Sequence, residues 1–314
     1  MIPTLILSFQ RKEQLERLIR VATAQGSDRI YISIDGPRDK HDGPVQSAII
    51  KMISQLRHEL DTEIIARHLS ENAGAGAAVI SGIDWFFEFE NEGIILEDDL
   101  SPEPGFFHAA DQFINRTDVD ERILMFSGTN IFDLNSSNVE LLKYPVVWGW
   151  ATTRPKWKVI RKLIFSPPSD LSFRKLGTQY FYWRVGKQRA LQGKTKVWDV
   201  PLSGAMFSEE YLCAITPTNM IANIGFDSFA SNTLNNEWPL NIPTVDHSLD
   251  FGSIPVTSAN TKNLEKFMRK KVFKFGLKYF LSSLFWSIFD SFRMRKSNYV
   301  GLHTKQSIID WKMV

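Results

Sequence analysis

Three consecutive carboxylates, Glu97, Asp98 and Asp99, directly follow the apolar run at residues 94–96. Negative charges this close together repel one another and raise each other's pKa unless a positive charge lies among them. Carboxylate oxygen is also the type of ligand that magnesium and manganese prefer. The pattern therefore predicts a site for a divalent cation. The alternative is a solvated acidic turn, which the "SPEP" sequence at residues 101–104 favours.

The first hundred residues alternate between apolar and amphipathic segments, which is typical of an α/β protein. We expect strands at residues 4–9, 29–35, 63–69 and 93–98, and helices at residues 12–25, 45–60 and 76–90. This order predicts a mostly parallel sheet, in which ligands bind beyond the carboxyl ends of the strands. The expected strand ends carry polar or glycine-rich segments, at residues 8–12, 33–38, 70–76 and 97–99. That edge of the sheet is the candidate site.

Composition narrows the class of protein. A chain of 314 residues that is 43% hydrophobic can bury a large core. The net charge of only +2 argues against a general nucleic-acid-binding surface, so we expect no nucleic acid partner. The lone Cys213 has no partner for an internal disulfide, which predicts a buried thiol and a reducing compartment. The first apolar run lacks a preceding basic stretch and is expected to be a strand rather than a signal peptide.

The glycine-rich segment "ENAGAGAAVISG" follows an expected strand and opens an expected helix. A dinucleotide-binding fingerprint has this context, but here the third glycine is missing, and the segment belongs to the third βα crossing. We therefore do not expect NAD. Two alternatives remain open: a tight turn into the helix, or small residues that let a nucleotide or sugar approach the backbone.

Seven segments together resemble the GT-A nucleotide-sugar glycosyltransferases, nearest to the N-acetylglucosaminyltransferase I-like group and its bacterial relatives in surface-polysaccharide pathways. They occur in family order within residues 5–226 and read "LILSFQRKEQL", "YISIDGPR", "NAGAGAAVISGIDWFFE", "GIILEDDLSPEPGFF", "VVWGWATTRPKW", "VWDVPLSGAMF" and "TPTNMIANIGF". The resemblance implies a GT-A (Rossmann-like), mostly parallel central sheet flanked by helices. Because no repeat or low-complexity linker occurs before residue 255, we expect this domain to span residues 1–260.

The resemblance also implies a donor site. Asp99 would ligate the Mn²⁺ or Mg²⁺ that bridges the two phosphates of a nucleotide-diphosphate sugar, and Glu97 and Asp98 would hold ribose and sugar hydroxyls. The remaining donor-binding residues are expected to be Ser8, Arg11, Asp35, Asn72 and Gly74. Asp35 would accept a hydrogen bond from a pyrimidine ring N–H. A solvated helix start is the alternative for Arg11.

The chain departs from the family at one point. Many relatives read "THT" after the "NIGF" block, whereas this chain has "SNT" at residues 231–233. Asn232 is a poorer metal ligand than histidine. We therefore expect either weak metal affinity or a metal shell completed by another residue such as His247.

The acceptor side of the site is expected around "VWDVP", where relatives carry a Trp-Asp pair. Asp199 would be the general base of an inverting transfer to a saccharide acceptor. The alternative is a loop aspartate that caps a turn. Trp148, Trp150 and Trp198 are expected to form a wall for the donor or acceptor sugar, because apolar sugar faces stack on indole rings. The alternative for Trp148 and Trp150 is ordinary core tryptophan.

Residues 261–314 form a segment of different character, expected to be a basic amphipathic helical tail. Its apolar run at residues 279–289 is shorter than the roughly 20 residues that span a bilayer. Through residues 262–296 the tail would lie on an anionic membrane surface, near a lipid-linked acceptor. This predicts a cytoplasmic protein, peripheral on the cytoplasmic face of the inner membrane. The alternative is a helix packed on the domain's own surface.

Two functions follow from these observations. The first is a metal-dependent hexosyl- or N-acetylhexosaminyl-transferase of surface polysaccharide or glycan synthesis. The second is a non-catalytic nucleotide-binding or scaffold protein of the same fold, since a fold does not imply an activity. The pairing of the triple carboxylate with Asp199 favours the enzyme.

Overall fold

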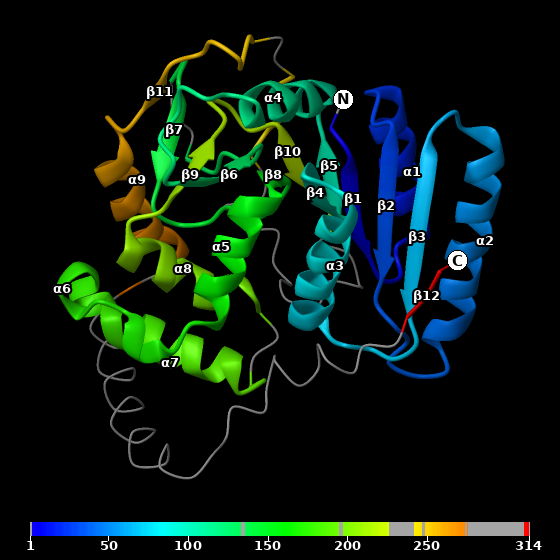
Figure 1. Cartoon of the computed structure of the whole chain (residues 1–314), viewed down its shortest axis with the longest axis horizontal. Helices are drawn as coiled ribbons and strands as arrows, with labels where there is room; N and C mark the ends of the chain where they lie inside the picture. Colours follow the sequence, from blue (N-terminus) through cyan, green and yellow to red (C-terminus); the bar gives the residue numbers. More distant parts are fainter. Residues whose placement is uncertain are drawn as a thin grey trace.

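Strands β1 to β4 form the parallel half of a ten-stranded sheet (Figure 1). They are β1 (Thr4–Ser8), β2 (Arg29–Ile34), β3 (Glu63–Leu69) and β4 (Glu92–Glu97). Their spatial order is β3-β2-β1-β4, and each neighbouring pair is parallel. The sequence predicted all four strands, because each is a short apolar run between polar segments.

The coordinates are a computed structural model. It describes residues 2–132, 136–194, 197–225, 242–246, 249–273, 275 and the backbone of 311–313.

The second half of the sheet is mixed in direction. β8 (Trp150–Thr153) is antiparallel to β4 and to β6 (Ile123–Ser127). β9 (Leu212–Ile215) is parallel to β6. The inserted strand β8 therefore joins the parallel N-terminal half to a second set of strands, so the prediction of a large, mostly parallel sheet describes the first half best.

Shorter strands complete the two edges. β7 (Val139–Leu142) is antiparallel to β9 and parallel to β11 (Val256–Thr257), which is the strand at one edge. β12 (Trp311–Met313) is antiparallel to β3 at the other edge. Outside the main sheet, β5 (Leu100–Pro102) pairs antiparallel with β10 (Ile221–Asn223).

The first three helices match the predicted ones. They are α1 (Lys12–Ala24), α2 (Asp42–Glu59) and α3 (Ala75–Phe89). Gly74, just before α3, has φ +81°, a conformation that favours glycine, so the glycine-rich segment does form a tight turn into the helix.

The other helices are α4 (Pro104–Ile114), α5 (Arg154–Phe165), α6 (Phe173–Leu176), α7 (Tyr180–Leu191) and α8 (Asp199–Glu209), with 3-10 turns η1 (Pro168–Asp170) and η2 (Gly177–Gln179). Helices cover both faces of the sheet. Alternate side chains of β1 show this: Ile6 belongs to a core with α1, α2 and α4, whereas Leu5 and Leu7 belong to a core with α3, α5, α7 and α8.

The expected domain boundary at residue 260 lies inside a packed unit. Helix α9 (Thr261–Phe267) and the π-helical turn η3 (Met268–Val272) bury Leu264 and Met268 in the core that contains α7 and α8. Phe275 lies 4.7 Å from the ring of Tyr182. At least residues 261–275 therefore belong to the domain, with Lys274 outside the described residues.

The apolar run at residues 279–289 also lies outside the described residues. Among the residues that are described, no helix is long and apolar enough to span a membrane.

Leu264→Ala tests whether the domain includes α9. Leu264 is 2% exposed, so truncation should lower the free energy of unfolding by about 2–4 kcal/mol through lost burial and a residual cavity. Urea unfolding of the full chain measures it. Lys262→Ala, on an exposed residue of the same helix, is the control and should change stability by less than about 0.5 kcal/mol. Equal stability of the two variants would contradict the packing.

Candidate functional site

The carboxylate of Asp98 fixes the geometry at the carboxyl end of β1 and β4. Its Oδ2 accepts hydrogen bonds from Ser8 Oγ at 2.8 Å and from Phe9 N at 2.9 Å, and its Oδ1 accepts one from Arg11 Nη1 at 3.3 Å. The residue is only 5% exposed. Burial raises the pKa of Asp98, and the hydrogen bonds from Phe9, Ser8 and Arg11 oppose that rise. Ser8 and Arg11 thus lie beside the triple carboxylate, as expected.

Arg11 is the positive charge that lies among the carboxylates. Its Nη1 is 3.5 Å from Asp99 Oδ2 as well as 3.3 Å from Asp98 Oδ1. Its Nη2 donates to the carbonyl of Gly225 at 3.3 Å. The alternative of a solvated helix start is therefore excluded for Arg11, whose side chain is largely buried.

Gly225 of the "NIGF" block packs directly on Asp99. A Cβ atom at residue 225 would lie 2.5 Å from Asp99 Oδ2, so the position has room only for glycine. The N–H of Ile224 donates to the carbonyl of Asp99 at 2.8 Å. These contacts follow from the pairing of β10 with β5, and they bring together two segments that are more than a hundred residues apart in the sequence.

Glu97 and Asp199 interact across the site. Burial together with the charges of Asp99, Asp98 and Asp199 raises the pKa of Glu97 to about 8, against the effect of Arg11. Asp199 is therefore close enough to the triple carboxylate to affect it. Burial also raises the pKa of Asp199, which backbone N–H groups at the start of α8 partly oppose. Asp199 begins an eleven-residue helix rather than lying in a loop, and its hydrogen bonds from the first backbone N–H groups of α8 agree with the capping role given as the alternative.

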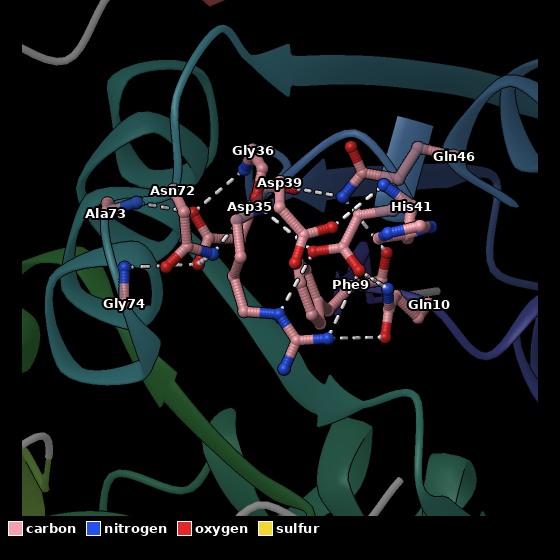
Figure 2. Close-up of polar contacts among 12 residues, drawn as sticks. Phe9, Gln10, Asp35, Gly36, Asp39, His41, Gln46, Asn72, Ala73 and Gly74 are labelled. Atoms are coloured by element: carbon pink, nitrogen blue, oxygen red, sulfur yellow. Dashed lines mark hydrogen bonds and ion pairs between the residues drawn. The ribbon is translucent and has the colours of Figure 1, made fainter. Parts of the chain in front are cut away.

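Asp35 holds two loops together (Figure 2). Its Oδ1 accepts from the N–H groups of Gly36 and Ala73, both at 2.8 Å, and its Oδ2 accepts from Asn72 Nδ2 at 2.9 Å and Gly74 N at 3.2 Å. A carboxylate has about four acceptor sites, so these four donors engage them all. The predicted hydrogen bond from a base N–H would have to replace one of these. Asn72 and Gly74 therefore have an observed role in positioning the loop before α3.

Sequence reasoning missed a second polar cluster beside Asp35. Asp42, at the start of α2, accepts hydrogen bonds from Gln10 Nε2, from the backbone N–H of Arg38 at 2.9 Å and from Arg38 Nε at 3.0 Å. The Arg38 guanidinium lies 4.7 Å from the centroid of the Phe9 ring. Gln46, also on α2, donates to the carbonyl of Asp35 at 2.8 Å. The polar residues that follow β1 and β2 in the sequence were the pattern from which this cluster could have been predicted.

Two of the three predicted wall residues are core residues. Trp150 is 1% exposed and Trp198 is 6% exposed, and their rings stack at 6.2 Å. Neither has a free face for a sugar, so the prediction of a wall is wrong for these two side chains. Strand β8 lies between β4 and β6 in the sheet, which buries Trp150. Trp148 is half-buried and remains the one candidate of the three.

The donor set at the site suits a hard cation only in part. Asp98 is fully engaged within the chain, whereas the side chain of Asp99 keeps 24% exposure. Among the described residues, no group of three or more His, Cys, Asp or Glu side chains is placed to hold a metal. Asn232 and His247 lie outside the described residues. Asp99 could therefore hold an ion only together with ligands from outside the described residues, such as the phosphate oxygens of a ligand.

Comparison with known proteins adds little. No protein-family model matches the chain, and no curated protein is similar to it. Among solved structures, the chain is similar to HddC from Yersinia pseudotuberculosis complexed with GMP-PN, at 17% identity and a TM-score of 0.25. The match covers 32% of this chain and 49% of HddC, about half of that protein's length. A likeness this small says nothing about function.

The cluster around Asp42 predicts a pH dependence of stability. The hydrogen bonds from Arg38 lower the pKa of Asp42 to about 2, whereas an unfolded aspartate has a pKa of about 3.9. The stabilisation is therefore complete above pH 4 and is lost as the pH falls toward 2. Asp42→Asn should lower the free energy of unfolding by about 1–3 kcal/mol at pH 7 and flatten its slope between pH 4 and 2. Urea unfolding across this range measures both.

Asp61→Asn, at an exposed carboxylate after α2, is the matched control and should keep the slope of the unaltered protein. If Asp42→Asn also kept that slope, Asp42 would not be the titrating group.

Proposed function

We propose that the protein is a metal-dependent glycosyltransferase of the GT-A type, which moves a sugar from a nucleotide-diphosphate donor to a saccharide acceptor. One observation carries the proposal. The triple carboxylate at the end of β4 and Asp199 at the start of α8 lie close enough to interact, at the edge of the sheet where ligands of α/β proteins bind. Clusters of carboxylates with raised pKa at such an edge are typical of active sites.

The donor would bind through the ends of β1, β2 and β4. Asp99 and the donor's phosphates would share a Mn²⁺ or Mg²⁺ ion, which, when bound, stabilises the charge that develops on the leaving phosphate. Arg11 can contribute positive charge at the same place, because its guanidinium already contacts Asp98 and Asp99. Ser8 and Asp98 position that guanidinium and the end of β1. Glu97 is left to hold sugar or ribose hydroxyls.

Asp199 would be the general base. Burial raises the pKa of Asp199, which makes its carboxylate a stronger base than a solvated aspartate. As the acceptor hydroxyl oxygen forms its bond to the sugar C1, the bond from C1 to the phosphate oxygen breaks and the hydroxyl proton passes to Asp199. Attack opposite the leaving nucleotide diphosphate inverts the configuration at C1.

The acceptor would be a lipid-linked saccharide. This extension is supported by the exposed basic residues of α9 and η3, which are part of the folded domain. They would hold the protein on the cytoplasmic face of the inner membrane, where such an acceptor is found. A non-catalytic protein of the same fold is the alternative, and donor hydrolysis separates the two.

Asp99→Asn should abolish metal-dependent use of the donor. The loss of one negative ligand weakens the ion's attachment, so manganese-dependent hydrolysis of nucleotide-diphosphate sugars should fall by at least about a hundredfold. The melting temperature without ligand should stay close to that of the unaltered protein. The readouts are nucleotide diphosphate release across a donor panel, and thermal shift with manganese and each nucleotide diphosphate.

Asp61→Asn serves again as the control with an intact site. Unchanged hydrolysis in Asp99→Asn at limiting metal would refute the role of Asp99. If the unaltered protein binds a nucleotide diphosphate but hydrolyses no donor, the non-catalytic alternative is correct.

Asp199→Asn should separate catalysis from donor binding. Removing the proton acceptor should lower turnover by a factor on the order of 100 to 10,000, with donor affinity little changed. Steady-state kinetics and donor titration measure the two quantities. Glu209→Gln, at the far end of the same helix, is the control. A fall in donor affinity with normal turnover at saturation would instead assign Asp199 to the donor site.

A further inference from the structure

Basic residues are concentrated in one part of the chain. Residues 154–194 contain eleven lysines and arginines and a single acidic residue, Asp170. The net charge of the whole chain is only +2, so the remainder of the chain is net negative. This asymmetry is hidden in the overall composition, and it indicates a local anionic partner.

The fold joins this stretch to the basic residues of α9 and η3. The Phe275 ring lies 4.7 Å from Tyr182, and the Phe273 ring lies 4.9 Å from Trp183, so both pack on α7. Figure 1 shows α6 and α9 on the same side of the molecule. We use the name basic face for the exposed cations of α6, α7, the turn after α7, α9 and η3. Its exposed cations are Arg174, Lys175, Arg189, Lys194, Lys262, Lys266, Arg269, Lys270 and Lys271.

Carboxylates neutralise part of this charge, and Glu265 of α9 interacts electrostatically with Lys143, Arg269 and Lys262. Glu210 contacts Lys175 at 3.2 Å and Lys143 at 3.8 Å, and Lys143 also lies 4.0 Å from Glu265. Asp170 and Glu209 are the other acidic residues of the neighbouring elements. Apart from Lys175, the exposed cations of the basic face form no ion pair with a described residue.

One exposed aromatic ring, that of Phe173, directly precedes Arg174 and Lys175, and it packs on two half-buried rings. Phe173 is 57% exposed, and its ring lies 5.4 Å from Tyr180 and 6.0 Å from Phe181 in edge-to-face arrangements. Tyr180 and Phe181 are 5.4 Å apart. An exposed ring beside arginine and lysine suits the headgroup region of a bilayer, where the ring meets acyl chains and the cations meet phosphates. A soluble polyanion that has no aromatic bases, such as a polyphosphate, would give the ring no apolar environment.

We propose that the basic face docks the folded domain directly on an anionic lipid bilayer, with Phe173 entering the headgroup region. This docking extends the membrane association of the proposed function, and its role in bringing the enzyme to a lipid-linked acceptor rests on that proposed function. The proposal assigns binding to α6 and α7, which lie outside residues 262–296.

Sedimentation with vesicles of phosphatidylglycerol and phosphatidylcholine tests the charges in the full chain. Arg174→Glu combined with Arg189→Glu should lower the partition coefficient at low salt by at least about tenfold, because each cation near an anionic surface contributes to attraction. Lys40→Glu combined with Lys51→Glu changes the net charge equally, on exposed lysines outside the basic face, and should lower it by less than about threefold. Equal effects of the two pairs would overturn the proposal.

A site-specific label tests insertion. The one native cysteine, Cys213, is buried, so an introduced surface cysteine can be labelled selectively. An environment-sensitive fluorophore at Phe173→Cys should shift to the blue on anionic vesicles and not on phosphatidylcholine alone. The control is Phe89→Cys, at a phenylalanine on α3 that is 58% exposed, and it should not shift. The absence of a shift at residue 173 would overturn the proposal. So would sedimentation of the protein without vesicles as a dimer that the Arg174→Glu and Arg189→Glu pair dissociates.

Donor hydrolysis without vesicles keeps the two proposals apart. The double variant Arg174→Glu with Arg189→Glu should hydrolyse donor in solution as the unaltered protein does. Suppose that the unaltered protein hydrolyses no donor but binds vesicles, and that the double variant weakens this binding. The glycosyltransferase proposal would then be refuted and docking through the basic face would be supported. If the protein hydrolyses donor and the double variant leaves vesicle binding unchanged, the glycosyltransferase proposal is supported and docking through the basic face is refuted.

Discussion

A carboxylate buried at the end of a strand must find hydrogen-bond donors, and this requirement at Asp98 organises the site. Leaving such a group unpaired costs several kcal/mol. The parallel register of β1 on β4 aligns Leu7 with Glu97, which brings the Ser8 hydroxyl and the Phe9 N–H to Asp98. Arg11, one residue before α1, supplies the third donor. The turn from β1 into α1 therefore places the Phe9 N–H and the Arg11 guanidinium within hydrogen-bond distance of Asp98.

Arg11 supplies a positive charge that offsets the triple carboxylate without a metal ion, because its guanidinium contacts Asp98 and Asp99. A divalent ion at Asp99 would compete with the Arg11 contact at 3.5 Å but not with the hydrogen bonds from Ser8 and Phe9 to Asp98. Loss of the Asp99 contact would leave the guanidinium held by Asp98 and by the Gly225 carbonyl. Arg11 and an ion would then lie side by side at the triple carboxylate rather than exclude one another.

The sequence predicted the first half of the fold and the gathering of Ser8, Arg11 and the triple carboxylate, because strand ends of parallel βα units share one edge. It could not predict that β8 runs antiparallel between β4 and β6, since strand direction depends on partners distant in the chain. The burial of Trp150 and Trp198 follows from that strand. Asp35 was recognised by position, but its four internal donors come from two loops whose approach no local pattern encodes. The packing of α9 on the domain agrees with the alternative left open for this segment, since its basic residues alone do not distinguish a surface helix from an independent tail.

Helix α7 connects the two surfaces to which we assign function. Its inner side packs on the first turn of α8: a Cβ at Gly186 would lie 2.8 Å from Val200 Cγ1, so glycine lets α7 approach the residue after Asp199 closely. Its first turn carries Tyr180 and Phe181, which contact the exposed Phe173 beside Arg174. In Figure 1, α7 lies on the lower side of the view, toward which β1 runs from the N-terminus. The part of the basic face on α7 therefore lies on the side where β1 ends, and α7 separates it from Asp199. This arrangement suits an acceptor that stays attached to lipid while its hydroxyl reaches the base.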